Sequence, residues 1–267
     1  MTHPASETLL HAEHLSRIYQ TGRRRVPALD DVSLGVHRGQ RLGIVGESGS
    51  GKSTLVRLLA GLDQPTAGTV SYAGRPVSGV RERELGFLRA GVQLVLQDPR
   101  SSLNPRMRVD DIVAEPLRSP AIRRERGEVD RAARVREVLD AVGLPADSVR
   151  RYPHEFSGGQ RQRIAIARAL APRPEVLIAD EAVSALDVSV RAQVLNLLMD
   201  LVDHLGLTLV FVSHDLAVVR HVCPDAVVLQ GGRIVEQGPT QAMFSDPQHA
   251  YTARLVAAIP TFRARES

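Results

Sequence analysis

Short, mostly apolar runs recur along the chain, and each is followed by polar residues or glycine. Runs of four to six such residues are typical of strands that are buried within a sheet. We therefore predict buried strands at residues 42–45, 92–96, 176–180 and 208–212. The third strand ends in Asp180, with Glu181 directly after it, and the fourth is followed by Ser213-His214-Asp215.

A second pattern alternates apolar and polar positions, which is typical of strands with one buried face. Residues 29–36 alternate in this way, with Val32, Leu34 and Val36 on one side. Further strands are predicted at residues 9–19, 69–72, 226–229 and 233–235. Gly231-Gly232 separates the last two and predicts a hairpin. Residues 21–25, which are rich in arginine, predict a basic turn.

Apolar residues at helical spacing form the third pattern, clearest in residues 189–205. The same spacing predicts helices at residues 55–60, 109–117, 128–142, 157–170 and 250–258. Little strand signal lies between Gln97 and Phe156. The fold class is therefore α/β. One domain, 1–267, combines an α/β core (1–97 and 157–240), a mainly helical insertion (98–156) and a tail (241–267).

Composition narrows the possible locations of the chain. It has 267 residues, of which 43% are hydrophobic and 24% charged, as in ordinary globular proteins. No apolar run approaches the roughly 18–20 residues of a membrane-spanning helix. Residues 1–6 do not resemble the start of a signal peptide. The single cysteine, Cys223, excludes an internal disulfide framework and a clustered thiolate metal site. We expect a cytoplasmic protein.

The charge distribution argues against a nucleic-acid partner. The net charge is +4, but segments such as 123–136 mix arginine with glutamate and aspartate, as solvated helix faces do. Aromatic residues make up only 3% of the chain, too few for a surface that stacks bases.

The clearest motif is Gly46-Glu47-Ser48-Gly49-Ser50-Gly51-Lys52-Ser53-Thr54, which has the G-x-x-x-x-G-K-[ST] pattern of a phosphate-binding loop. Its glycines let backbone N–H groups turn toward an anion, and the next helix directs its positive N-terminus there. Lys52 is the only lysine in the chain. Its ammonium is a compact point charge, which suits a loop of backbone amides better than the planar guanidinium of arginine. The motif by itself predicts nucleotide binding, with Lys52 reaching the β- and γ-phosphates and Ser53 holding Mg²⁺.

Other motifs suggest which nucleotide-binding family this is. Ser157-Gly158-Gly159-Gln160, before Asp180-Glu181, resembles the signature motif of ABC transporter ATPases. Gln97, Asp187 within Ser184–Asp187, and His214 stand where that family has its Q-, D- and H-loops. The resemblance covers essentially the whole chain. It implies the P-loop ABC ATPase fold, a RecA-like core with an antiparallel β subdomain and a helical subdomain.

The resemblance also implies roles for these residues in ATP hydrolysis. Asp180, Ser53 and Gln97 would hold Mg²⁺. Glu181 would polarise the attacking water, while His214 and Gln97 would contact the γ-phosphate. Tyr19 would stack on adenine, although a core aromatic is the alternative reading.

Ser157 to Gln160 would act on the ATP of an opposite subunit, and Asp187 would be a further nucleotide-binding residue. The active form would then be a head-to-tail pair with a second ABC ATPase of the same or a related chain.

A narrower resemblance points to importers of oligopeptides, dipeptides or nickel. It rests on residues 97–99, 101–106 and 152–156, and on a tail with Asp246-Pro247, His249, Tyr251-Thr252, Leu255 and Pro260. Ala182 stands where most members have proline, and this slightly favours nickel as the cargo. The tail lacks the cysteine cluster of some members, so we expect no iron–sulfur cluster.

The implied partners are transmembrane permease subunits, docked on residues 98–108, and indirectly an extracytoplasmic substrate-binding protein. The location would be the cytoplasmic face of the membrane. Peptide import is the first hypothesis and nickel-chelate import the second.

Two further readings stay open. A soluble ABC ATPase acting on ribosomes or DNA usually carries two cassettes or a long coiled coil, which this chain lacks. A regulatory partner with a dead site is opposed by intact Glu181 and His214. The sequence names neither the cargo nor the second ATPase.

Overall fold

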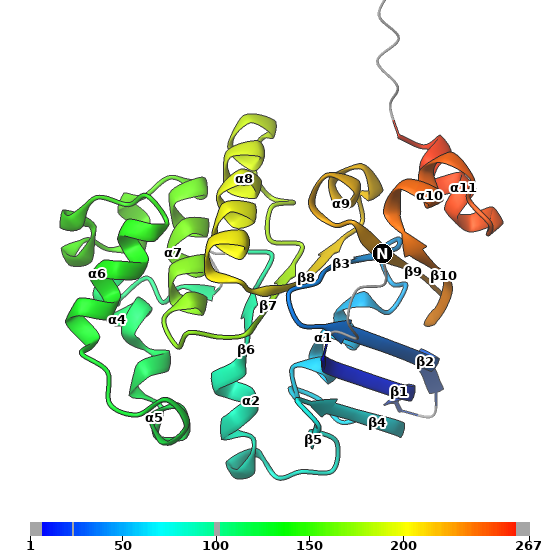
Figure 1. Cartoon of the computed structure of the whole chain (residues 1–267), viewed down its shortest axis with the longest axis horizontal. Coiled ribbons are helices and arrows are strands. Elements are labelled where there is room, and N and C mark those ends of the chain that lie inside the picture. Colours follow the sequence, from blue (N-terminus) through cyan, green and yellow to red (C-terminus); the bar gives the residue numbers. More distant parts are fainter. Residues whose placement is uncertain (1–6, 23, 99–101, 260–267) are drawn as a thin grey trace, which may run out of the picture.

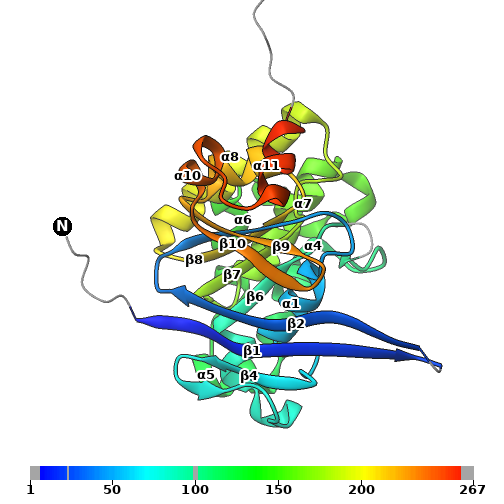
Figure 2. The same ribbon diagram turned by 90° about the vertical axis from the view of Figure 1, so that its right-hand side faces the viewer.

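The computed structural model describes residues 7–22, 24–98 and 102–259. It contains two sheets that lie next to each other (Figures 1 and 2). The smaller sheet is antiparallel, and its strands in spatial order are β2 (Arg24–His37), β1 (Thr8–Thr21), β4 (Ala67–Tyr72) and β5 (Arg75–Pro76). Its two long strands, β1 and β2, form one hairpin.

The larger sheet carries the site. Its strands in spatial order are β10 (Arg233–Pro239), β9 (Asp225–Gln230), β3 (Arg41–Val45), β8 (Thr208–Ser213), β7 (Val176–Asp180) and β6 (Val92–Val95). The five strands from β9 to β6 are parallel, and only the edge strand β10 is antiparallel. The carboxyl ends of the parallel strands therefore meet at one edge of the sheet.

Helices connect and cover these strands. They are α1 (Lys52–Leu59), α2 (Gly86–Gly91), α4 (Val109–Ala114), α5 (Pro120–Arg126), α6 (Arg131–Ala141), α7 (Gly158–Leu170), α8 (Val188–Leu205), α9 (Leu216–Val222), α10 (Thr240–Ser245) and α11 (Ala250–Ala257). Short 3₁₀ turns lie at Glu82–Glu84, Pro116–Arg118, Ala146–Arg150 and Pro153–Glu155. Figure 1 shows α4, α5 and α6 grouped at one end of the molecule, and α10 and α11 at the other.

The larger sheet separates two hydrophobic clusters. Successive side chains of a strand point to opposite faces. Leu177 of β7 and Phe211 of β8 join the cluster that contains α7, α8 and α9. Ile178 and Val210, the neighbours along the same strands, join the cluster of α1 and the antiparallel sheet. Helix α1 is thus packed between the two sheets, which fixes the loop that precedes it.

Most predicted elements are present, with shifted boundaries that have local causes. The predicted helix 109–117 ends at Ala114, because Pro116 lacks the N–H that a helix needs. The predicted helix 128–142 begins only at Arg131, since the Asp130 side chain accepts from the Ala133 N–H as an N-cap. The predicted basic turn is shorter, because Arg24 and Arg25 already pair in β2. Helix 55–60 begins earlier, at Lys52.

Some predicted features lie outside the described residues, namely the start 1–6, Arg23, Pro99, Ser101 and the residues from 260 onward. In the described parts of the chain, none of the helices has both the length and the apolar character needed to cross a membrane.

Candidate active site

The phosphate-binding loop connects the end of β3 to the start of α1, and its glycines are required by close contacts. A Cβ on Gly46 would lie 2.3 Å from the Leu229 carbonyl oxygen, and one on Gly51 would lie 2.6 Å from the Ala28 carbonyl oxygen. Gly51 is also the N-cap of α1, with a φ of 109°. It has no side chain to cap the first N–H groups of the helix, so these remain available for an anion.

The loop lines a cavity of about 810 Å³. Its walls come from the loop itself, from the start of β2, and from residues that follow the parallel strands β6, β7 and β8. They are Val26, Pro27, Ala28, Glu47, Ser48, Gly49, Gly51, Lys52, Ser53, Thr54, Gln97, Glu181 and His214. Gln97, Glu181 and His214 follow β6, β7 and β8, so the parallel sheet brings together residues that are far apart in the sequence.

Lys52 is the buried cation of this cavity, with 5% of its surface exposed. Its Nζ donates to the carbonyl oxygens of Gly46 (2.7 Å) and Glu47 (2.9 Å). It lies 3.9 Å from Glu181 Oε1. Burial lowers the pKa of the Lys52 ammonium, and the carboxylates of Glu181 and Asp180 offset part of that effect. A bound phosphate would supply further negative charge next to this ammonium.

Asp180 ends β7 beside the cavity. Among the described residues, its buried Oδ1 has no hydrogen-bond partner. Burial and the negative charge of Glu181 raise the pKa of Asp180, against the opposing effect of Lys52. An orphaned carboxylate oxygen fits a hard divalent cation, which prefers oxygen ligands. The exposed hydroxyl of Ser53 and the amide of Gln97 line the cavity and offer further oxygen ligands. The residues present therefore fit Mg²⁺.

Glu181 has an unusual backbone conformation, with a φ of 48°. Left-handed backbone is uncommon for a residue with a side chain, and such strain clusters at functional sites. The backbone is held by two hydrogen bonds: Glu181 N–H donates to the Val212 carbonyl, and Ser184 Oγ donates to the Glu181 carbonyl, both at 3.0 Å. The side chain is directed between Lys52 and His214, whose Nδ1 lies 3.5 Å from Oε2.

The predicted signature residues lie elsewhere. Ser157 is the N-cap of α7: its hydroxyl accepts from the Gln160 N–H and its own N–H donates to Gln160 Oε1. Ser157, Gly159 and Gln160 line a separate cavity of about 460 Å³. Asp187 is the N-cap of α8, accepting from the Val190 N–H at 3.0 Å. Within this chain, the signature and the phosphate loop do not share a cavity.

Tyr19 is not among the residues that line the phosphate-loop cavity. Its hydroxyl donates to Asp63 Oδ2 at 2.7 Å, and the Arg17 guanidinium lies 4.6 Å from the centre of its ring. Its cross-strand neighbour Val26 does line the cavity. Adenine stacking by Tyr19 therefore stays a prediction.

Sequence reasoning missed four residues at the site. Val26, Pro27 and Ala28 line the cavity, and Tyr251 of α11 contacts the backbone of Glu47. The alternating pattern began only at Leu29, so it gave no reason to extend β2 to this point. The tail motif contains Tyr251 but indicates no role for it.

Comparisons with known proteins show the family of this chain. A family profile described as "ABC transporter" matches residues 29–184. A protein of Brucella abortus (strain 2308), named "Putative peptide import ATP-binding protein", is 49% identical over 96% of this chain and 78% of its own length. A protein of Brucella ovis with the same descriptive name is 47% identical over 95% of this chain and 79% of its own length.

Solved structures of similar fold are ABC transporter cassettes or components as well. The ATP-binding cassette MJ0796, in a dimeric post-hydrolysis state bound to ADP and Pi, has a TM-score of 0.77 and 31% identity. The match covers 87% of this chain and 99% of the cassette. The cbiO1 protein of Clostridium perfringens has a TM-score of 0.77 and 26% identity, over 90% of this chain and 92% of its own. The predicted fold class is confirmed.

Proposed function

This chain belongs to the ABC transporter family, and from that premise we propose that it is the ATP-binding and ATP-hydrolysing subunit of an importer for oligopeptides or dipeptides. The observation that carries the ATPase assignment is the convergence of Lys52, Glu181 and His214 on one cavity next to a phosphate-binding loop. The cargo assignment is supported by the names of the relatives and by the importer-branch motifs of the sequence.

Each residue has a defined task in hydrolysis. The loop amides and Lys52 hold the β- and γ-phosphates. Ser53, Asp180 and Gln97 would hold Mg²⁺, which would supply positive charge against the phosphates. Glu181 orients a water and accepts its proton as the oxygen attacks the γ-phosphorus. The bond to the bridging oxygen breaks, and ADP and phosphate are released. His214, beside Glu181, contacts the γ-phosphate. The buried, preorganised charges lower the barrier by positioning and electrostatic stabilisation.

The active form is a head-to-tail dimer in this proposal. The signature residues Ser157 to Gln160 lie at a separate cavity, so their glycine-containing helix end is available to the ATP of a second subunit. The solved dimers of a similar cassette support pairing as such. Asp187 lies next to this helix end, since a Cβ on Gly159 would reach Val190 Cγ1 of α8 at 2.4 Å.

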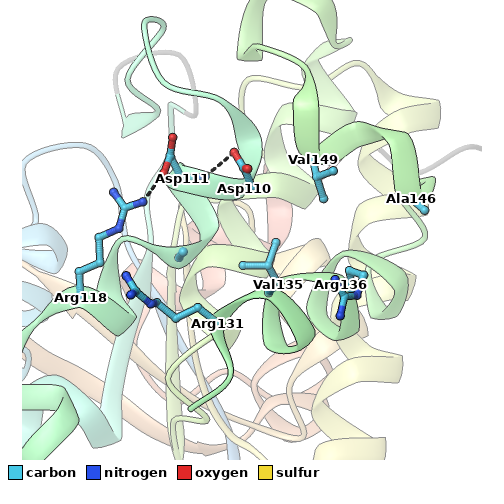
Figure 3. A pocket seen from close by; sticks show the side chains of 10 residues that line it. Asp110, Asp111, Arg118, Arg131, Val135, Arg136, Ala146 and Val149 are labelled. Atoms are coloured by element: carbon cyan, nitrogen blue, oxygen red, sulfur yellow. Dashed lines mark hydrogen bonds and ion pairs between the residues drawn. The ribbon is translucent and has the colours of Figure 1, made fainter. Parts of the chain in front are cut away.

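Permease subunits dock on the helical region in this proposal. A cavity of about 360 Å³ lies between α4 and α6 (Figure 3). Its floor includes Ala114, Val135 and Val149, and charged side chains surround it, among them the ion pair between Asp111 and Arg118. An apolar floor with a charged rim suits a short amphipathic helix.

The first residues that line this cavity, Asp110 and Asp111, come shortly after residues 98–108 in the sequence. Residues 98–108 are the segment predicted from sequence to contact the membrane subunits. Of that segment, residues 99–101 lie outside the described structure. Docking there would place the chain at the cytoplasmic face of the membrane, with the extracytoplasmic binding protein reached only through the permease.

Reconstitution of the whole transporter tests the proposal. The chain is assembled in vesicles with its permease subunits and supplied with binding protein loaded with a peptide or with chelated nickel. We expect the peptide to stimulate ATP turnover and to accumulate inside the vesicles. Stimulation by nickel alone would select the alternative cargo. Stimulation by neither would reject the import assignment, and absence of Mg²⁺-dependent turnover would reject the ATPase assignment.

Two alanine variants on α6 test the docking surface in the same vesicles. Ala132 is exposed and lines the cavity of Figure 3, whereas its neighbour Ala133 is exposed but does not line it. We expect Ala132→Arg to abolish stimulation by loaded binding protein while basal turnover is unchanged. Ala133→Arg is the matched control and should remain stimulated. Co-purification with ribosomes instead of permease subunits would favour the soluble ABC ATPase reading.

A further inference from the structure

Helix α11, the last helix of the described residues, contacts the phosphate-binding loop through Tyr251. The backbone N–H of Glu47 donates to Tyr251 Oη at 2.8 Å, and Tyr251 is 2% exposed. We propose that Tyr251 is a positioning residue of the nucleotide site, and that α11 contributes to the site through this side chain. The inference rests on the proposed ATPase function.

The contact acts on the peptide unit that holds Lys52. The Gly46 carbonyl and the Glu47 N–H belong to one peptide group. In a trans peptide these two groups point in opposite directions, and the described residues contain no cis peptide bond. The carbonyl accepts from Lys52 Nζ at 2.7 Å, while the N–H donates to Tyr251 at 2.8 Å. Tyr251 therefore fixes, from behind the loop, the direction of a carbonyl that anchors Lys52.

This peptide group would otherwise have freedom to rotate. Gly46 lacks a Cβ, so its backbone tolerates conformations that other residues avoid. The Glu47 N–H is only partly buried, and it meets the tyrosine oxygen in only one orientation of the peptide, so the hydrogen bond favours that orientation. The two hydrogen bonds also polarise each other through the peptide group, since they share it. Pinning both ends keeps the ammonium aimed at one place.

Tyr251 is itself held firmly by the sheet. The carboxylate of Glu236 on β10 accepts from the backbone N–H groups of Gln248 and His249, both at 3.0 Å. His249 Nδ1 then accepts from the Tyr251 N–H at 3.2 Å, as the N-cap of α11. The start of α11 is thus attached to the edge strand of the larger sheet (Figure 2).

The expected consequence is a change in nucleotide affinity without a matching change in turnover. Without the tyrosine oxygen, the free loop spends part of its time in orientations that misplace Lys52. The apparent dissociation constant then rises in inverse proportion to the competent fraction. Bound nucleotide selects the competent orientation, so the rate at saturating ATP is little affected.

Tyr251→Phe tests this in the full chain, because it removes the oxygen and keeps the ring. Tyr72→Phe is the matched control: Tyr72 is 4% exposed, and its hydroxyl donates to Glu175, at 3.1 Å, in the antiparallel sheet region. The probe is N-methylanthraniloyl-ADP with Mg²⁺, followed by fluorescence. We expect Tyr251→Phe to raise Kd and the KM for ATP about 3- to 10-fold, the equivalent of one hydrogen bond. The kcat should stay within about twofold of wild type.

Glu236→Ala provides a second route to the same effect, because it releases the start of α11 and should raise Kd in the same direction. Melting temperatures of all variants check that they fold. Wild-type Kd in Tyr251→Phe, or an equal rise in Tyr72→Phe, would overturn the inference alone. A wild-type chain that fails to bind the probe would overturn the proposed function and, with it, this inference.

Discussion

Two helices in this molecule begin at glycine-containing motifs, but their N-termini are capped in different ways. Helix α1 begins after Gly51, which has no side chain to cap it, and its first residue is the buried Lys52. Helix α7 begins after Ser157, whose side chain and N–H exchange hydrogen bonds with Gln160 in a capping box. One helix end is left open within a walled cavity, and the other is already capped by its own residues.

The difference separates two ways in which a helix N-terminus can meet an anion. An uncapped helix end with a buried ammonium has a strong need for an anion, so it binds nucleotide by itself. A capped helix end is stable without a ligand and keeps its shape until an anion is presented to it. The first arrangement suits a primary binding site, and the second suits a surface that completes the site of a neighbouring subunit.

The largest expected effect comes from mixing two inactive variants. Glu181→Gln removes the proton acceptor, and we expect turnover to fall about 10²- to 10⁴-fold while Mg²⁺-ATP still binds. Ser157→Arg blocks the signature end in the partner's site. In a head-to-tail pair of the two variants, one composite site contains both defects and the other contains neither. A mixture should therefore hydrolyse ATP when each variant alone does not.

This result would establish that the two helix ends work across subunits. The carboxylate-to-amide control is Glu128→Gln, an exposed residue beside α6, mixed with Ser157→Arg in the same proportions. If Ser157→Arg alone keeps wild-type turnover, the contrast between the two helix ends has no functional meaning.

The next largest effect concerns the choice of lysine at the open helix end. Lys52→Arg keeps the charge but replaces a compact ammonium with a planar fork, in a position that is 5% exposed and lies between two carbonyl oxygens. We expect affinity for Mg²⁺-ADP to fall about 10- to 100-fold, because hydrogen bonds to a charged group are lost. Titration with a fluorescent nucleotide measures it. Unchanged affinity would mean that charge alone suffices.

The smallest expected effect is a gain in stability from Asp180→Asn. The folded-state pKa of Asp180 is raised above 3.8, so ionisation costs folding free energy as the pH rises from 3.8 through the raised value. At about pH 7 that cost is fully present. We expect Tm of the nucleotide-free variant to rise by about 2–4 °C at that pH. The gain should disappear well below pH 3.8, where the Asp180 carboxyl is protonated in both the folded and the unfolded chain. A lower Tm at neutral pH would contradict it.

The sequence was informative wherever a residue type is chemically irreplaceable. The phosphate loop could be predicted because only glycines fit beside the Leu229 and Ala28 carbonyls. Ser157 could be predicted as an N-cap from its own chemistry, and the structure confirms it. The buried strands could be predicted because a parallel strand that is covered on both faces consists of a nearly continuous apolar run.

The residues that sequence reasoning missed depend on contacts between distant segments. Ala28 lines the cavity only because β2 crosses the phosphate loop, and Tyr251 contacts Glu47 across 204 positions. The helix α5 was missed because arginines dominate it and only Ile122 is buried, so its apolar stripe is too short to detect. The separation of Ser157 from Lys52 is likewise a property of the folded chain.

The strand order also has a consequence for how the chain folds as it is synthesised. β1, β2 and β4 come from the first third of the sequence, and β1 pairs with both of the others, so the antiparallel sheet can form early. β3, which carries the phosphate loop, pairs only with β8 and β9, near the other end of the chain. Such distant pairings are slow, because a large loop must close before they form. The nucleotide-binding loop therefore gains its supporting neighbours late, and a nascent chain that stops before β8 carries the motif without the strands that pair with β3 and without His214.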